Sequence, residues 1–432
     1  MTPFILGCTG IGLLFILLFL RQPVWLAMVL CGIGGIIALN NVQVAKFVVG
    51  TTFFDVAQGY SLSVVPLFIL MGEVASGSRM SADLFQAARA LVSGLRGGLS
   101  VATIAASGAF GAICGSSVAT AAAMTRIAMP EMERAGYRQG TAAASVAAGG
   151  TLGILIPPSI ILVIYGSIAE QSVARLFAAS MLPGLVLMGL YAVIAVWLAH
   201  RSDAAPHDAG LPLGARLRAL LRPWQFILLF AITIGGIYAG IFSPNEAASI
   251  GAFGAIVLGL LRRSLTLRGL VRAVRASVAL SCALFMIIIG ATIFANFVVQ
   301  TRLPDTLLNL ATAAELSPFV VMGLIVFIYI LLGCFLEGIG MVLITVPVFL
   351  PVVTGFGFDP IWFGVLVTVL VELGLITPPV GMNLFIIRGQ APTLSMAELY
   401  RAILPFLLAP VVLVLLLFAM PSLALWLPGV LY

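Results

Sequence analysis

Two proline pairs interrupt two long apolar segments of this chain. The first lies in TLGILIPPSI, from Thr151 to Ile160, and the second in ELGLITPPVG, from Glu372 to Gly381. A proline has no N–H group, its ring clashes with the preceding turn, and the residue before it is pushed away from helical angles. Each pair is therefore expected to unwind its helix for about one turn and to free several backbone carbonyl groups.

Freed carbonyl groups at membrane depth can bind a hard cation. Each one costs several kcal/mol when nothing pairs with it, and a sodium ion takes several oxygen ligands that do not compete for protons. Hydroxyl groups of Ser116 and Ser117, in the sequence CGSSVA, could complete the coordination shell. The alternative is a proline kink healed by neighbouring helices, which is common in membrane proteins. Two such motifs in one chain favour the ion site.

The two regions are copies of one architecture. They align without a gap when the chain is shifted by 221 residues. The aligned pairs are Ser116 and Glu337, Pro130 and Pro351, Gly136 and Gly357, Leu152-Gly153 and Leu373-Gly374, and Pro157-Pro158 and Pro378-Pro379. Five predicted membrane crossings lie between the copies, and an odd number inverts the second relative to the first. Inverted repeats with interrupted helices are typical of alternating-access secondary transporters, whose site lies where the copies meet.

The amino-acid composition indicates the class of protein to which these segments belong. The chain has 432 residues, 62% of them hydrophobic and 8% charged. Such a composition predicts an all-α polytopic membrane protein, and the alternation expected of a transmembrane barrel is absent. The run Phe4–Leu20 has no basic flank before it and no small-residue cleavage site after it, so we expect a retained span instead of a signal peptide.

The apolar segments predict ten crossings and two re-entrant hairpins. The crossings are Phe4–Leu20, Val24–Leu39, Ser61–Ala75, Gln139–Ala169, Phe177–Ala199, Gln225–Phe242, Glu246–Leu261, Ala276–Val299, Ile361–Ile387 and Ala402–Met420. The hairpins are Leu99–Pro130 and Pro318–Pro351, each with two short apolar arms around a small or polar centre. Backbone that leaves a helix at this depth must be surrounded by protein or must line a water-filled cavity.

These elements predict five domains. Scaffold helices occupy residues 1–78, and an amphipathic arm helix occupies 79–98. The first repeat of a transport domain occupies 99–200, cytoplasmic loops and further scaffold helices occupy 201–299, and the second transport repeat occupies 300–432.

Arginines give the predicted topology. The segments Arg79–Arg96, His200–Arg222 and Arg262–Arg275 are basic, and the ten-crossing scheme places all three on one side, as the positive-inside rule requires. The net charge of +6 is therefore a topology signal and not a nucleic-acid footprint. SPNEAA, from Ser243 to Ala248, predicts a helix start with a capping box.

Two acidic residues are predicted deep within apolar sequence, namely Glu337 at the second hairpin tip and Glu372 before the second proline pair. An intramembrane carboxylate is a functional candidate by default. The alternative for each is a structural hydrogen bond or a position nearer the interface. The sequence favours a functional role for Glu337 and leaves Glu372 open.

At these residues the sequence resembles the large membrane subunit of tripartite ATP-independent periplasmic (TRAP) transporters of the dicarboxylate, or DctM-like, type. The likeness covers essentially the whole chain. It rests on PLFILMGEVASGS (66–78), GAFGAICGSSVATAAAM (108–124), GGTLGILIPPS (149–159), YAGIFSPNEAA (238–248) and LGLITPPVGMNLF (373–385). The resemblance implies an elevator-type, sodium-coupled importer of organic acids in a bacterial inner membrane. It also implies a small membrane subunit, expected on a separate chain, and a periplasmic binding protein that delivers the substrate.

The resemblance also implies two sodium sites. The first would use Ser116, Gly153, Ile156 and Pro158, and the mirrored one Gly338, Gly374, Thr377 and Pro379. Relatives often have Asp at the second hairpin tip, where this chain has Glu337. Sodium ions would be the coupling ions.

The substrate of such a transporter is an anion, yet the sequence predicts no arginine at membrane depth beside the broken helices. Helix N-termini within the membrane can bind a carboxylate through free N–H groups and the helix dipole. The substrate-binding candidates are Ser117, Ser159 and Glu337.

Three other classes were compared with this prediction. A permease of an ATP-driven importer gives no reason for inverted hairpin repeats, and no cytoplasmic docking helix is identifiable. An ion channel could use the same carbonyl chemistry, but channels generally build a pore around symmetry. An intramembrane enzyme is disfavoured because the chain has no HExxH motif, and its two histidines, His200 and His207, lie in a basic loop.

Overall fold

The fold is built of helices alone throughout the described chain. The structure is a computed structural model that describes residues 2–201 and 210–432, and no strand occurs within these ranges. His207 and its neighbours in the predicted basic loop therefore lie outside the described residues. The all-α prediction is confirmed.

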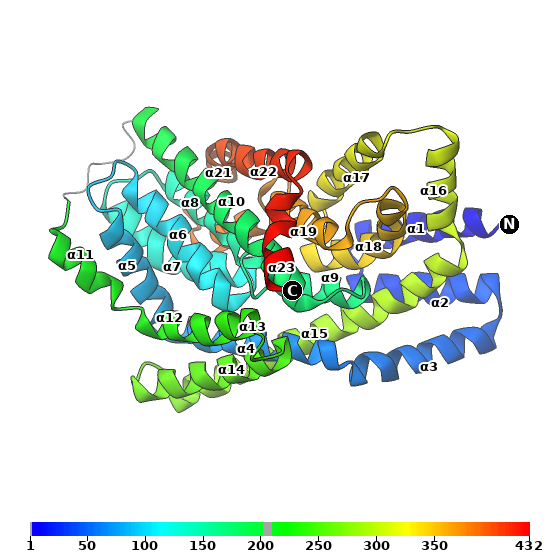
Figure 1. Cartoon of the computed structure of the whole chain (residues 1–432), viewed down its shortest axis with the longest axis horizontal. Helices are drawn as coiled ribbons and strands as arrows, with labels where there is room; N and C mark the ends of the chain where they lie inside the picture. Colours follow the sequence, from blue (N-terminus) through cyan, green and yellow to red (C-terminus); the bar gives the residue numbers. More distant parts are fainter. Residues whose placement is uncertain (1, 202–209) are drawn as a thin grey trace.

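Hairpins and interrupted helices form two matching sets. The first hairpin comprises α6 (Gly98–Cys114) and α7 (Ser117–Arg134), followed by α8 (Gln139–Leu155) and α9 (Ile160–Ile168). The second comprises α17 (Pro318–Gly333) and α18 (Gly338–Gly355), followed by α19 (Pro360–Ile376) and α20 (Met382–Gln390). In Figure 1 the first hairpin lies toward one end of the long axis and the second toward the other, with α9 and α19 between them.

The remaining helices surround these two sets. Before the first hairpin come α1 (Pro3–Phe19), α2 (Val24–Leu39), α3 (Val42–Gln58), the short η1 (Tyr60–Ser63), α4 (Val64–Gly77) and α5 (Met80–Leu91). Between the sets come α10 (Val173–Arg201), α11 (Leu213–Leu220), α12 (Trp224–Phe230), η2 (Ala231–Gly235), α13 (Gly236–Tyr238), α14 (Pro244–Leu261), α15 (Leu267–Gln300) and α16 (Leu303–Ala313). The chain ends with α21 (Met396–Ile403), η3 (Leu404–Leu407), α22 (Leu408–Ala419) and α23 (Ser422–Leu431).

Helix boundaries confirm the 221-residue repeat. Adding 221 to both bounds of α7 gives both bounds of α18, and the same shift converts the bounds of α8 into those of α19. The residues that precede α7 and α18, Ser116 and Glu337, both have extended backbone angles. The sequence repeat is therefore a repeat of local structure, including the points at which helices begin and end.

Seven helices within the described chain are long and apolar enough to cross a membrane, or eight if the bent pair Gly214–Leu220 and Trp224–Tyr238 counts as one span. One of the seven, Gly338–Gly355, is the second arm of a predicted hairpin. The predicted crossings Phe4–Leu20, Val24–Leu39 and Ile361–Ile387 contain shorter apolar helices of 10–17 residues. The multi-pass class is confirmed, whereas the count of ten crossings stays a prediction.

Four helices and the ends of both hairpins differ from the prediction. Helices α3, α16, α21 and α23 were not predicted, because the first three mix apolar residues with polar ones and α23 is short. The hairpins were expected to end at Pro130 and Pro351, but α7 continues to Arg134 and α18 to Gly355, each with its proline inside the helix. The capping box at Ser243 was correct: Glu246 N–H donates to Ser243 Oγ at 3.3 Å, and Ser243 N–H donates to Glu246 Oε2 at 2.8 Å.

The basic segments meet at one end of the molecule, where Figure 1 shows α5 and α11. Arg262, after α14, pairs with Asp83 of α5 at 3.0 Å. Arg216 of α11 donates to the Ser93 carbonyl at 2.9 Å. These contacts confirm that the three basic segments share one side.

Glycines allow each hairpin to lie directly against its broken helix. A Cβ atom added to Gly111 of α6 would lie 2.3 Å from the Cα of Gly153 in α8, and one added to Gly333 of α17 would lie 2.9 Å from the Cα of Gly374 in α19. Both contacts are backbone against backbone, so no side-chain rotation can make room. The two repeats therefore share the same close helix contact.

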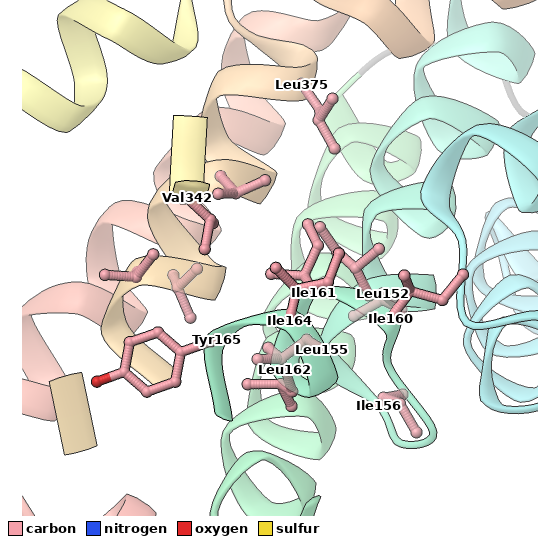
Figure 2. Close-up of a cluster of buried hydrophobic side chains, with 14 of the residues drawn as sticks. Leu152, Leu155, Ile156, Ile160, Ile161, Leu162, Ile164, Tyr165, Val342 and Leu375 are labelled. Atoms are coloured by element: carbon pink, nitrogen blue, oxygen red, sulfur yellow. The ribbon is translucent and has the colours of Figure 1, made fainter. Parts of the chain in front are cut away.

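The apolar core continues across the two repeats. Figure 2 shows Leu152 and Leu155 of α8 and Ile161 and Ile164 of α9 in one buried cluster with Val342 of α18. Close packing of this kind makes the hairpins and broken helices one body.

Topology can be tested with single cysteines at Glu133 and Thr354, in a variant without the five native cysteines. Both positions are exposed in the last turn of α7 or α18, and they are 221 residues apart. Because the repeats are inverted, we expect a membrane-impermeant thiol reagent to label Thr354→Cys from outside intact cells and Glu133→Cys only after the inner face is opened. Labelling of both from the same side would contradict the inverted repeat.

Replacement of Gly111 by alanine tests the close helix contact. We expect Gly111→Ala to lower the free energy of unfolding by about 1–3 kcal/mol, the usual cost of overpacking. Gly189→Ala on α10 is the matched control, because nothing lies within 4 Å of its added Cβ. Thermal unfolding of the purified protein measures both variants. Equal midpoints would show that the α6–α8 contact is not as tight as described.

Candidate functional site

Both long helices break at the proline pairs, as the sequence predicted. Helix α8 ends at Leu155, and Ile156 is extended with φ −78° and ψ 119°. Helix α19 ends at Ile376, and Thr377 is extended with φ −90° and ψ 127°. The Pro157-Pro158 and Pro378-Pro379 peptide bonds are both cis. Each break therefore removes carbonyl groups from the regular ladder of helix hydrogen bonds.

The first break lies against the first hairpin tip. Gly115, which has a φ of 63°, makes the turn between α6 and α7, and its added Cβ would lie 3.0 Å from the Pro158 carbonyl oxygen. A Cβ on Gly153 would lie 3.1 Å from the Ser116 carbonyl oxygen. Three of the four residues expected at the first ion site, Ser116, Gly153 and Pro158, thus meet here. Ile156 is the extended residue between them.

The second break is arranged in the same way with different side chains. Gly374 lies against Gly333, and Gly338 at the start of α18 lies against Val371, one turn before Gly374 on α19. Thr377 directs its hydroxyl to the Leu373 carbonyl at 2.5 Å, and the Pro379 carbonyl accepts a hydrogen bond from the Tyr400 hydroxyl. Thr377 keeps a free oxygen lone pair, whereas the Pro379 carbonyl already has one partner.

The second halves of the broken helices exchange partners between the repeats. Helix α9 packs on α18 of the second hairpin, and α20 packs on α7 of the first. Ser117 and Asn383 join α7 to α20, with Asn383 Nδ2 donating to Ser117 Oγ at 2.7 Å. Ile161 of α9 lies beside Gly338 of α18. Four helix N-termini therefore converge in two crossed pairs.

The substrate-binding candidates occupy three of these four N-termini. Ser117 is the first residue of α7, and Ser159 is the N-cap of α9, where its hydroxyl accepts from the Leu162 N–H at 3.3 Å. Glu337 is the N-cap of α18, and its side chain makes no capping hydrogen bond. Ser117 and Ser159 are buried, and Glu337 is half-buried. Their role in substrate binding stays a prediction.

Glu372 lies in the dry interior of α19. It is 0% exposed, and neither carboxyl oxygen has a hydrogen-bond partner in the described part of the chain. Its counterpart under the 221-residue shift is Thr151 of α8, whose hydroxyl lies 3.1 Å from the Tyr191 hydroxyl. The two repeats therefore differ at this position, because only the first has a hydrogen-bonded side chain there.

Sequence reasoning missed Thr120 and Asn383. The Thr120 hydroxyl would lie 2.8 Å from a Cβ on Gly153, and Asn383 reaches the first hairpin from the second repeat. Thr120 Oγ1 and Asn383 Oδ1 are both buried and have no hydrogen-bond partner among the described residues. Asn383 had one visible signal, because it is a polar amide in the otherwise apolar stretch MNLFII.

Comparison with known proteins places the chain in one family. Residues 11–423 match the family described as "Tripartite ATP-independent periplasmic transporter, DctM component". The C4-dicarboxylate TRAP transporter large permease protein DctM of Pseudomonas aeruginosa is 35% identical over 87% of this chain and 88% of its own length. The sialic acid TRAP transporter large permease protein SiaM of Vibrio cholerae is 30% identical over 95% of this chain and 96% of its own.

A solved structure has a similar fold. The YdaH transporter of Alcanivorax borkumensis superposes with a TM-score of 0.60 over 88% of this chain and 90% of its own, at 18% sequence identity. This likeness shows the fold, and the family match over residues 11–423 settles the class of the protein. The chain belongs to the DctM component family of TRAP transporters, which are multi-pass permease subunits of the bacterial inner membrane and not enzymes.

Proposed function

We propose that this chain is the large membrane subunit of a sodium-coupled importer of organic acids. The two hairpins and the two broken helices would carry the substrate as one body past the other helices, in an elevator movement. One observation carries the proposal: the helices after the breaks exchange partners, α9 with α18 and α20 with α7. This exchange brings freed carbonyl groups and free helix N–H groups of both repeats into one region.

Carbonyl oxygen atoms at the breaks would bind the coupling ions. Around the first break the Ser116 and Pro158 carbonyls lie close to the glycines that oppose them. Around the second, the Thr377 hydroxyl lies one helical turn beyond Leu373, beside Gly374. Neutral oxygen ligands suit sodium, because they bind a hard cation at any physiological pH without first losing a proton.

Helix N-termini would hold the substrate carboxylate. The free N–H groups and the dipole of a helix start favour an anion, by roughly 0.3–1 kcal/mol when exposed and up to about 2 kcal/mol when partly buried. The two arginines of the first hairpin, Arg126 and Arg134, are exposed on α7 and are not at the tip. The substrate is therefore held by several weak interactions, with hydroxyls such as Ser117 and Ser159 assisting.

The moving body would slide on contacts made by small residues. Gly72 of α4 lies against Cys114 at the end of α6, where an added Cβ would be 2.9 Å from the Cys114 Cα. Gly340 of α18 lies against Val24 at the start of α2, at 3.2 Å from its added Cβ. Such contacts present few side chains that interlock across the boundary, which favours sliding over rotation.

Organic acids are the substrate class that the relatives support. The two relatives described above carry C4-dicarboxylates and sialic acid in their names, and both compounds are carboxylates. The family description is of a tripartite, periplasmic system. We therefore propose a small membrane subunit and a periplasmic binding protein as partners.

Sodium coupling is tested by uptake into proteoliposomes that contain the membrane complex, with its binding protein outside. We expect uptake to require a sodium gradient and no ATP. Thr377→Val removes the hydroxyl at nearly constant size and should raise the half-maximal sodium concentration on the order of tenfold. Thr377→Ser keeps the hydroxyl and is the matched control. Uptake that persists when potassium replaces sodium would refute the coupling.

Substrate affinity of the membrane complex alone forms a separate test. Because helix N-termini supply only weak attraction, calorimetry without the binding protein should find weak binding that depends on sodium. Tight binding of a dicarboxylate in sodium-free buffer would require a dedicated cationic side chain at the site. That result would overturn the proposed recognition by helix N-termini.

A further inference from the structure

We propose that Asn383 supplies the oxygen ligand that completes the cation site beside the first hairpin. The site in the first repeat would then need a side chain from the second repeat. This inference rests on the proposed sodium coupling and goes beyond it, because the resemblance assigned that site to residues of the first repeat alone.

Position and burial single out Asn383. It is the second residue of α20, directly after the second break, and it is 0% exposed. Helix α20 packs on α7 and on α8, the two helices that flank the first break. Asn383 is therefore an amide of one repeat inside the ion-binding region of the other.

Only one end of the amide is paired. Nδ2 donates to Ser117 Oγ at 2.7 Å, which fixes the orientation of the side chain against the first hairpin tip. Oδ1 is buried and has no hydrogen-bond partner among the described residues. An unpaired buried acceptor costs about 1–3 kcal/mol, and a cation bound to Oδ1 would offset that cost.

The first turn of α7 carries a second unpaired oxygen atom, that of Thr120. Thr120 lies one turn after Ser117 on α7, and its Oγ1 is also buried without a partner in the described chain. It adjoins Gly153, whose added Cβ would be 2.8 Å from it, and the Ser116 carbonyl lies 3.1 Å from the same point. Ser116 and Thr120 of the first repeat, and Asn383 of the second through its contact with Ser117, thus bring oxygen-bearing groups of both repeats to the first hairpin tip.

The chemistry of these atoms selects a cation. An amide oxygen is an acceptor and repels a carboxylate, so it does not serve the substrate anion. Asn383 Oδ1 and Thr120 Oγ1 are both covered by protein, so a ligand there has no contact with bulk water. A hard monovalent cation without its water is the ligand that neutral oxygens can bind in such a place.

The mirrored position lacks this group. The 221-residue shift pairs Asn383 with Leu162 and Ser117 with Gly338, and Ile161, the neighbour of Leu162, is the residue of α9 that lies beside Gly338. The contact between the repeats is therefore polar at the first hairpin and apolar at the second. Ile161 provides a control at an equivalent place in the fold.

The test measures ion binding without transport. Thermal unfolding of the purified membrane complex in lipid nanodiscs is recorded at increasing sodium chloride, with potassium chloride keeping the ionic strength constant. A bound ion stabilises the folded state according to its concentration relative to the dissociation constant. We expect Asn383→Ala to raise the sodium concentration for half-maximal stabilisation roughly tenfold. Ile161→Val should leave it unchanged.

One further variant separates a ligand from a structural hydrogen bond. Asn383→Asp keeps the size and adds a charged oxygen ligand, so it should lower the half-maximal sodium concentration. If the alanine variant does not fold, the aspartate variant decides.

Two results would overturn the inference. They are an unchanged sodium dependence in Asn383→Ala, and an unchanged or raised half-maximal concentration in Asn383→Asp. Failure of the proposed function looks different, because the wild-type complex would then show no stabilisation by sodium over potassium at all.

Discussion

A backbone carbonyl that leaves its helix inside a membrane must find another partner, and the structure is organised around that requirement. Each proline pair frees carbonyls in the middle of a long apolar segment. Each break is covered by a helical hairpin, so that protein surrounds the irregular backbone. The hairpins can approach only because glycines face one another at both contacts, Gly111 with Gly153 and Gly333 with Gly374. The helix breaks, the hairpins and the glycine contacts thus act together to surround the irregular backbone with protein.

Because the broken helices exchange partners between the repeats, each helix break is joined to the hairpin of the opposite repeat. If each broken helix packed only on its own hairpin, the two repeats would be separate ion-binding units. Instead α20 reaches the first hairpin and α9 reaches the second. Each broken helix is therefore in contact with the hairpin tip of the opposite repeat, and the proposed coupling between ion and substrate would act through this contact.

The repeats are alike in backbone and unlike in side chains. The bounds of α7 and α8 coincide with those of α18 and α19 under the 221-residue shift, yet Ser116 corresponds to Glu337 and Thr151 to Glu372. The hydrogen bond of Ser117 with Asn383 takes the place of the apolar contact of Gly338 with Ile161. The second repeat carries Glu337 and Glu372, and the first carries the polar contact between the repeats. The two repeats therefore share a backbone arrangement and differ in the polar groups that it presents.

The helical membrane class, the two breaks, the hairpins and the repeat could all be predicted from the amino-acid sequence, because they follow from local properties. Hydropathy depends on composition, and a proline changes the backbone wherever it stands. The residues at the breaks, including Gly153, Ile156 and Thr377, could be named for the same reason. Helices α3 and α16 escaped notice, because their polar residues mask the apolar pattern. The three-dimensional packing was needed to show which hairpin receives which helix, and that Asn383 meets Ser117 across 266 residues of chain. A contact over that distance depends on the packing of whole helices, which no local pattern in the sequence encodes.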